Sequence, residues 1–169
     1  AYLKDALTGG EITQASLRLS GNLVDMPFDN PKLGEFRFIA QIANGQYAYV
    51  PQTKGKPVSL ANTWPAITSL NGELVYQRSA MQFKGAGKLA GAPQLAWDKI
   101  EATMPRVKDL DVTVKAQARG PLADMQGVVV RSALNELLDH TLEKSQATGM
   151  AELKMQLNVP VRALQKTSV

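Results

Sequence analysis

Hydrophobic and polar residues alternate with a period of two over long stretches of this chain. The longest stretch covers residues 110–119, where Leu, Val, Val, Ala and Ala alternate with polar or charged residues. Residues 17–23, 36–42 and 153–159 follow the same pattern. An α-helix would scatter these apolar side chains around its surface, whereas a β-strand places them on one face. We therefore predict that each of these stretches is a strand with one apolar and one polar face.

Shorter stretches at residues 46–49, 70–76, 80–84 and 95–103 also favour strands. Turn-forming residues such as Asn44-Gly45 and Gly91-Ala92-Pro93 separate them. Strands at this spacing indicate antiparallel hairpins and meanders, because a parallel sheet needs crossover helices. The sequence thus predicts a mainly β fold built on a curved antiparallel sheet. Two forms stay open, a groove with a free concave face and a partly closed barrel or sandwich.

Residues 121–145 depart from this alternation, because their apolar residues are spaced as in a helix. These residues are Val130, Leu134, Leu137, Leu138 and Leu142. Pro121 suits a first helical turn, and Ser132 is placed to cap a second, separate helix. We predict one or two short amphipathic helices in this insert, within a single domain of residues 1–169. A shorter helical turn is predicted at residues 2–7.

The pattern Gly-x-Leu-x-Asp-Met occurs twice, at residues 21–26 and 120–125, each time after an alternating strand. The first copy continues to Pro27, and the second leads into the predicted helix. Matches this short also arise by chance. The pattern is consistent with a repeated strand-and-turn unit.

The composition is that of a folded domain, with 44% hydrophobic residues and a net charge of +4 in 169 residues. Cysteine is absent, which excludes disulfides, thiolate nucleophiles and cysteine-based metal sites. Apolar runs stay short of the about 18 residues that a membrane span requires, so we expect a soluble segment. Any targeting segment or anchor is expected to lie outside this sequence.

Residues with catalytic potential are few. His140 would share a helix face with Glu136 and Glu143, where a metal site is conceivable but a solvated helix face is favoured. The glycine-rich residues 85–91 lack the spacing of a phosphate-binding loop and indicate a hairpin. We therefore expect no catalytic residue, metal or cofactor.

The basic residues are distributed with one on the polar side of each of several strands. They are Arg18, Arg37, Lys84, Lys99, Lys115 and Lys154. No aromatic motif typical of RNA binding accompanies them, so a solvated sheet face is favoured over nucleic-acid binding. Such a surface also suits anionic lipid headgroups. We expect Trp64 and Trp97 to serve packing.

Three segments occur in an order and at a spacing that resemble one protein family. They are residues 17–28 (LRLSGNLVDMPF) with 34–38 (GEFRF), residues 64–76 (WPAITSLNGELVY), and residues 112–124 (VTVKAQARGPLAD) with 148–160 (TGMAELKMQLNVP). Together they resemble the YhdP branch of the AsmA-like proteins of Gram-negative bacteria. The likeness extends from about Leu3 to Val161.

This resemblance implies a bridge-like lipid carrier, a long periplasmic chain anchored in the inner membrane by an N-terminal helix. Its repeated β units would form a U-shaped groove through which phospholipid acyl chains pass towards the outer membrane. The present chain would be one internal segment, bordered by neighbouring β-groove repeats. The family implies no catalytic residues.

Alternation and resemblance together predict an apolar groove that holds acyl chains while headgroups stay in water. The expected lining residues are Leu17, Leu19, Phe36, Phe38, Val112, Val114, Met155 and Leu157. The alternative for each residue is packing beneath the helix. The alternative for the whole chain is a structural or scaffolding β domain that works through protein contacts in the cell envelope.

Overall fold

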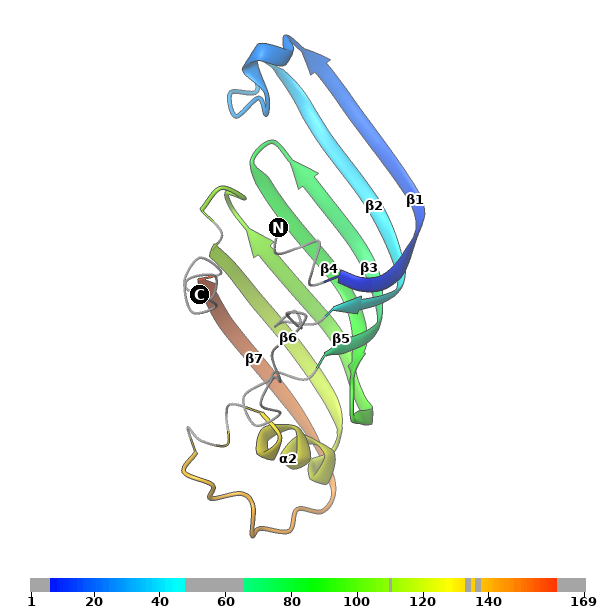
Figure 1. The fold of residues 1–169 in the computed structure, drawn as a ribbon, viewed down its shortest axis with the longest axis vertical. Helices are drawn as coiled ribbons and strands as arrows, with labels where there is room; N and C mark the ends of the chain where they lie inside the picture. The colour runs from blue at the N-terminus through cyan, green and yellow to red at the C-terminus, as the bar shows by residue number, and fades with distance from the viewer. Residues whose placement is uncertain (1–6, 48–65, 110, 133–134, 136–137, 161–169) are drawn as a thin grey trace, which may run out of the picture.

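Seven antiparallel strands form one sheet in the computed structural model of this chain, and their order in the sheet is their order in the sequence (Figure 1). The structure describes residues 7–47, 66–109, 111–132, 135 and 138–160. The strands are β1 (Leu7–Gly21), β2 (Gly34–Tyr47), β3 (Ile67–Gln77), β4 (Ala80–Leu89), β5 (Ala92–Met104), β6 (Asp111–Pro121) and β7 (Met150–Pro160). The predicted mainly β fold with an antiparallel meander is confirmed.

The sheet is open. Within the described residues, β1 pairs only with β2 and β7 pairs only with β6, so the first and last strands do not meet. Of the two forms that the sequence left open, the open sheet is the one observed.

The strand register keeps apolar residues on one face from edge to edge of the sheet. One row of cross-strand neighbours is entirely apolar, and it consists of Ala15, Ala40, Leu74, Phe83, Ala102, Val114 and Leu157. An adjacent row on the opposite face is entirely polar, and it consists of Gln14, Gln41, Glu73, Lys84, Glu101, Lys115 and Gln156. Successive residues of a strand point to opposite faces, so the predicted two-faced strands combine into a two-faced sheet.

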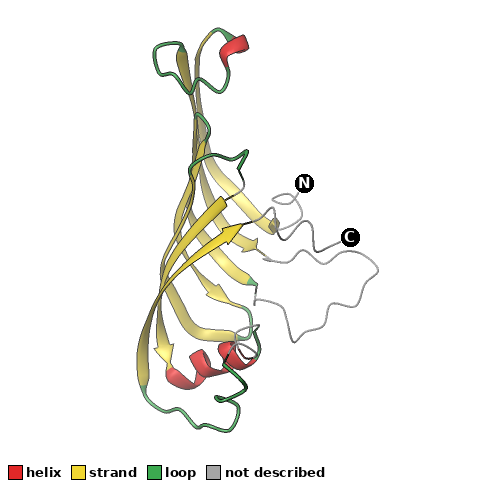
Figure 2. Cartoon of the chain, turned by 90° about the vertical axis from the view of Figure 1, so that its left-hand side faces the viewer, coloured by secondary structure: helices red, strands yellow, loops and turns green. Residues whose placement is uncertain are grey.

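Irregular pairing is concentrated at one end of the strands. Every register shift between β1 and β6 lies near the start of β1, β3 and β5 or the end of β2, β4 and β6. In an antiparallel sheet these strand ends lie together. Bulges bend strands and increase their twist, so this end curls while the other end stays regular (Figure 2).

The helix α2 (Leu122–Val130) lies on the concave side of the curled end (Figure 2). Its Met125 belongs to the same buried cluster as Leu95 and Trp97 of β5 and Ala116 and Ala118 of β6. The apolar face is therefore the concave face. The expected packing role of Trp97 is confirmed, and Trp64 lies outside the described residues.

The helix α2 is shorter than the predicted insert. Among the described residues, 138–144 form turns, and Asp139 and His140 adopt positive φ angles of 50° and 56° that interrupt a right-handed helix. Hydrogen bonds fix the segment instead. The amide of Gln126 donates to the carbonyls of Leu142 and Ser145, both at 2.6 Å.

Two other boundaries differ from the prediction. The alternation at residues 17–23 runs past the end of the strand, because Gly21 leaves the extended conformation with a φ of 114°. Leu23 instead begins the short 3-10 helix η1 (Leu23–Asp25). Residues 2–6 of the predicted N-terminal turn lie outside the described residues, and Leu7 already belongs to β1.

A pair of glycines allows Phe83 to lie against the sheet. Gly72 and Gly85 are cross-strand partners on the concave face. A Cβ atom on Gly72 would lie 2.2 Å from the carbonyl oxygen of Lys84 and 2.8 Å from the ring of Phe83. Neither the backbone nor the packed ring can accept a methyl group at these distances.

We expect Gly72→Ala to lower the free energy of unfolding by about 1–3 kcal/mol, the usual effect of overpacking. Chemical denaturation followed by circular dichroism measures it. The control is Gly9→Ala, because the three atoms nearest to a Cβ there all belong to the flexible side chain of Gln46, the first of them at an ordinary 3.4 Å. Equal stability of the two variants would contradict this packing.

Candidate functional site

The regular end of the concave face is apolar, and many of its side chains stay accessible in the described part of the structure. We call it the open apolar face. It consists of Leu17, Leu19, Phe36, Phe38, Leu74, Tyr76, Met81, Ala102, Val112, Val114 and Leu157, with Phe83 at its border, where that ring also packs against the buried cluster. All of these side chains are exposed or half-buried, and Leu17 remains 59% exposed. A face this apolar and this accessible is typical of a binding surface.

Aromatic rings lie side by side on this face. Phe38 lies opposite Leu17 of β1 and Tyr76 of β3. Phe36 meets Tyr76 edge to face, with ring centroids 5.3 Å apart and an interplanar angle of 84°. Edge-to-face contacts add to the stability gained by burial, so this part of the face is held in shape without a covering element.

The structure places the eight predicted lining residues on one face. Leu17, Leu19, Phe36 and Phe38 lie on the adjacent strands β1 and β2. Val112, Val114, Met155 and Leu157 lie on the adjacent strands β6 and β7, at the other edge. Seven of the eight belong to the open apolar face. Their contact with lipid stays a prediction.

Met155 is the exception among these eight. It lies opposite Ala116 and packs against the buried cluster near α2. The packing alternative therefore describes Met155 better than a place in the open face.

The central strands contribute lining residues that the sequence analysis did not select, namely Leu74, Tyr76, Met81, Phe83 and Ala102. In β3, Leu74, Val75 and Tyr76 are all apolar, so alternation alone does not assign their faces. The pairing of Tyr76 with Phe38 and Met81 does assign them. Cross-strand register is the signal that was missing.

Hydrogen bonds between turns tie three hairpins together at the regular end. The hydroxyl of Ser79 donates to Asp29 at 2.5 Å, which links the β3–β4 turn to the β1–β2 connection. The amide of Val107 donates to the carbonyl of Ser79 at 2.8 Å, which links the β5–β6 connection to the same turn. These bonds fix one rim of the open apolar face.

The opposite face is polar and basic. Gln41 donates to Glu73 at 2.8 Å, and Lys84 lies 3.7 Å from Glu101. A shallow hollow of about 590 Å³ is bordered by four of the six predicted outer cations, Lys84, Lys99, Lys115 and Lys154. The sheet thus brings these four cations together on one face. Exposed ion pairs such as that of Lys84 with Glu101 contribute little stability.

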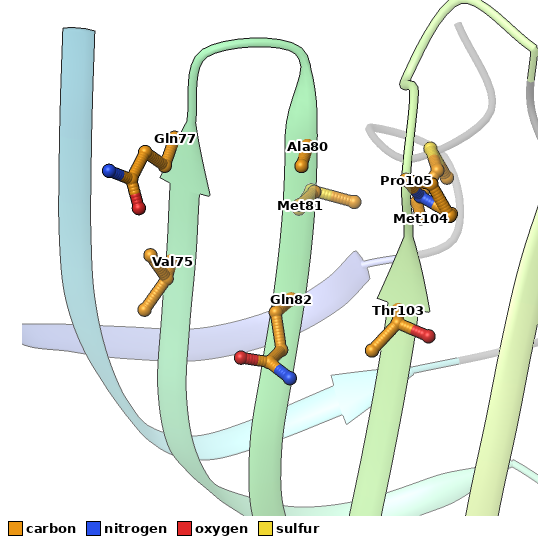
Figure 3. Close-up of a pocket in the computed structure, with 8 residues that line it drawn as sticks. All are labelled: Val75, Gln77, Ala80, Met81, Gln82, Thr103, Met104 and Pro105. Carbon is orange, nitrogen blue, oxygen red and sulfur yellow. The ribbon is translucent and has the colours of Figure 1, made fainter. Parts of the chain in front are cut away.

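A second hollow, of about 260 Å³, lies where β3, β4 and β5 meet the turns of the regular end (Figure 3). It is lined by Val75, Gln77, Ala80, Met81, Gln82, Thr103, Met104 and Pro105. Sites for small molecules usually enclose about 300–1,000 Å³. This hollow is smaller and open to solvent, so the open apolar face is the better candidate for a binding site.

His140 lies in a turn and not on the predicted helix face. Its Nδ1 atom is 2.7 Å from Oε1 of Glu143, which also accepts a hydrogen bond of 2.7 Å from Asn135. The hydrogen bond to His140, followed by that to Asn135, lowers the pKa of Glu143. Within the described residues no three His, Cys, Asp or Glu side chains are placed to hold a metal ion. This network fastens the connection between α2 and β7.

We expect His140→Ala to raise the pKa of Glu143 towards that of an ordinary glutamate, because the group with the largest lowering effect is removed. A lowered folded-state pKa stabilises the fold above the unfolded pKa, and this effect is lost as the pH falls through the folded value. NMR titration of the Glu143 carboxyl group measures the change. Thr141→Ala in the same turn is the control, and an unchanged Glu143 titration in His140→Ala would contradict the assignment.

No helix in the described part of the chain is long and apolar enough to cross a membrane.

Comparison with known proteins gives one family. A family model described as "YhdP protein" matches residues 1–169. The protein named "Intermembrane phospholipid transporter YhdP" of Escherichia coli (strain K12) is 24% identical over 160 residues. That alignment covers 95% of this chain but 12% of the relative, so this chain spans about an eighth of the relative's length. No solved structure matches the chain.

Proposed function

The chain belongs to the YhdP family, and we propose that it is one segment of a lipid-carrying groove in which the open apolar face holds phospholipid acyl chains. The segment is non-enzymatic in this proposal. The complete protein is periplasmic, anchored in the inner membrane, and moves phospholipid towards the outer membrane. Support comes from the family, from the name of the E. coli relative, and from the shape and chemistry of the sheet.

The continuity of the apolar rows carries the proposal. A row such as Ala15 to Leu157 crosses all seven strands without a polar residue. An acyl chain lying along such rows gains about 0.8 kcal/mol for each methylene group removed from water. Neighbouring rows offer similar surface, so a chain can slide with little change in free energy.

The open edges of the sheet support a continuous groove. β1 is 15 residues long, and within the described residues one of its edges is unpaired. Long unpaired edges invite further strands. We propose that neighbouring β-groove repeats of the same chain pair with β1 and β7, which would extend the apolar rows beyond this segment.

A scaffolding role makes a different prediction about the same face. A scaffold would use the open apolar face to hold a protein and would retain no lipid. Polar substitutions on the face would then release a protein partner and leave the amount of bound lipid unchanged.

We expect Leu17→Asp in the full-length protein to reduce co-purified phospholipid roughly tenfold. The reason is that a charge in the groove removes contact with about two methylene groups, or ~1.6 kcal/mol. Arg18→Asp is the matched control, because Arg18 is the next residue of β1 and points to the opposite face. Lipid extraction and mass spectrometry measure the phospholipid bound per protein.

Leu17 is more than half exposed, so the substitution leaves the core intact, and circular dichroism checks the fold. Equal lipid content in the two variants would refute the proposed groove at β1. A second pair of variants on β6, Val114→Asp and its control Thr113→Asp, repeats the test near the other edge of the sheet.

A further inference from the structure

Four lysines on the polar face of the sheet form a zigzag across four consecutive strands, which we call the lysine track. They are Lys84 of β4, Lys99 of β5, Lys115 of β6 and Lys154 of β7. Glu101, directly opposite Lys84, lies two positions from Lys99 on the same strand, and the same offset recurs at the next two strand pairs. Each lysine is therefore the diagonal neighbour of the next, at a separation of roughly 7–8 Å.

The lysine track borders the shallow hollow of about 590 Å³ on the polar face. The floor of the hollow is the backbone of one cross-strand row that belongs to the concave face, namely Gly85, Ile100, Ala116 and Met155. The longer side chains of the polar face stand on either side of this row. All four lysines are exposed, so the hollow presents its cations to solvent on the side of the sheet opposite the open apolar face.

The acidic residues of the sheet do not neutralise the lysine track. Lys84 lies 3.7 Å from Glu101, and Lys154 lies 3.4 Å from Glu152. Within the described part of the chain, Lys99 and Lys115 form no ion pair. Glu101 is the single acidic residue among those that line the hollow, against four lysines, so the hollow carries a net positive charge. Neighbouring cations repel one another, and a bound anion would relieve that repulsion.

We propose that the lysine track is the docking surface for an acidic segment of a partner protein. The long stems of lysine let the ammonium groups move to meet carboxylates at several positions along such a segment. A partner bound there would hold the outside of the sheet and leave the open apolar face free. The proposal concerns the opposite face of the sheet, so it goes beyond lipid carriage and does not depend on it.

Nucleic acids and other phosphate polymers fit the lysine track less well. None of the residues that line the hollow is aromatic, so the hollow offers no stacking platform for bases. Arginine is also absent from the lining, although its planar guanidinium group is the one that binds phosphate through two parallel hydrogen bonds. Lysines alone, as mobile point charges, suit a series of separate carboxylates.

A membrane surface is also a poorer occupant, because carboxylates are interspersed with the cations. Glu101 lies between two of the lysines in the sheet. Beside the hollow, Asp98 Oδ2 and Glu152 Oε2 each lie 3.9 Å from Arg119 Nε. An anionic lipid surface would place negative charge against all three carboxylates, whereas a peptide can present its acidic groups at the lysines alone. The charge pattern therefore favours a protein segment.

Photo-cross-linking in the full-length protein tests the proposal, with Gln117→p-benzoylphenylalanine as the probe in the hollow. The ligand is a biotinylated peptide of alternating Glu and Ser, whose carboxylates repeat about every 7 Å when it is extended, close to the step of the lysine track. We expect a saturable cross-link between position 117 and this peptide. Gln41→p-benzoylphenylalanine is the control, because Gln41 lies on the same face of β2 outside the lysine track and should give several-fold less product.

Removal of charge provides a second measurement in the protein that carries the Gln117 probe. Lys99→Gln with Lys115→Gln should weaken peptide binding roughly fivefold, because two of the four cations are lost. Lys32→Gln with Lys144→Gln removes the same charge away from the hollow and should leave binding unchanged. Raising the salt from about 0.05 M to about 0.3 M should weaken binding to the unsubstituted lysine track, since salt screens exposed charges.

Equal products at positions 117 and 41, or equal binding by the two double variants, would overturn the proposal. Preferential cross-linking of position 117 to phosphatidylglycerol added to the detergent micelles would overturn it in favour of a lipid surface. The result is separable from the lipid test at Leu17. Lys99→Gln with Lys115→Gln should keep its co-purified phospholipid, because both lysines lie on the face opposite the proposed groove.

Discussion

The phase of side-chain alternation is kept across all seven strands, and this single constraint creates the surface on which function is proposed. The period of a strand is two residues, so a slip of one residue in any pair would turn charged side chains inward. In β4 and β5, such a slip would place Lys84 or Glu101 among Phe83 and Ala102. Burying an unpaired charge in an apolar layer costs free energy, so the alternation itself selects the register.

The concave face is divided into a part covered by α2 and a part that stays accessible. Beneath α2 the inward residues of β6 are small, Ala116, Ala118 and Gly120, and they leave room for a helix. On the regular end, inward side chains such as Phe36 and Phe38 are only half-buried. The same sheet thus supplies its own core at one end and an accessible apolar surface at the other. Bulges gathered at the covered end bend the strands over that core.

The sequence predicted what depends on local periodicity and missed what depends on pairing. Alternation identified β1, β2, β6 and β7 and assigned their faces, and the resemblance to the family was correct. The run Leu74-Val75-Tyr76 could not be assigned to faces, because all three residues are apolar and only the register with β2 decides. A curved sheet was predicted, but alternation could not decide between an open groove and a partly closed barrel or sandwich, since a period of two is the same in both forms. Helical spacing runs on to Leu142, but α2 ends at Val130, and the positive φ angles of Asp139 and His140 later interrupt any right-handed helix in the rest of the insert.

The two helical turns, η1 after β1 and α2 after β6, are five strands apart, and this odd number has a geometric consequence. Neighbouring strands run in opposite directions. Two strands whose numbers differ by an odd number therefore end at opposite ends of the sheet (Figure 1). The antiparallel order alone therefore places η1 at one end of the strands and α2 at the other. A ligand that moved across the sheet from β1 to β7 would pass η1 at one end of the strands and then α2 at the opposite end.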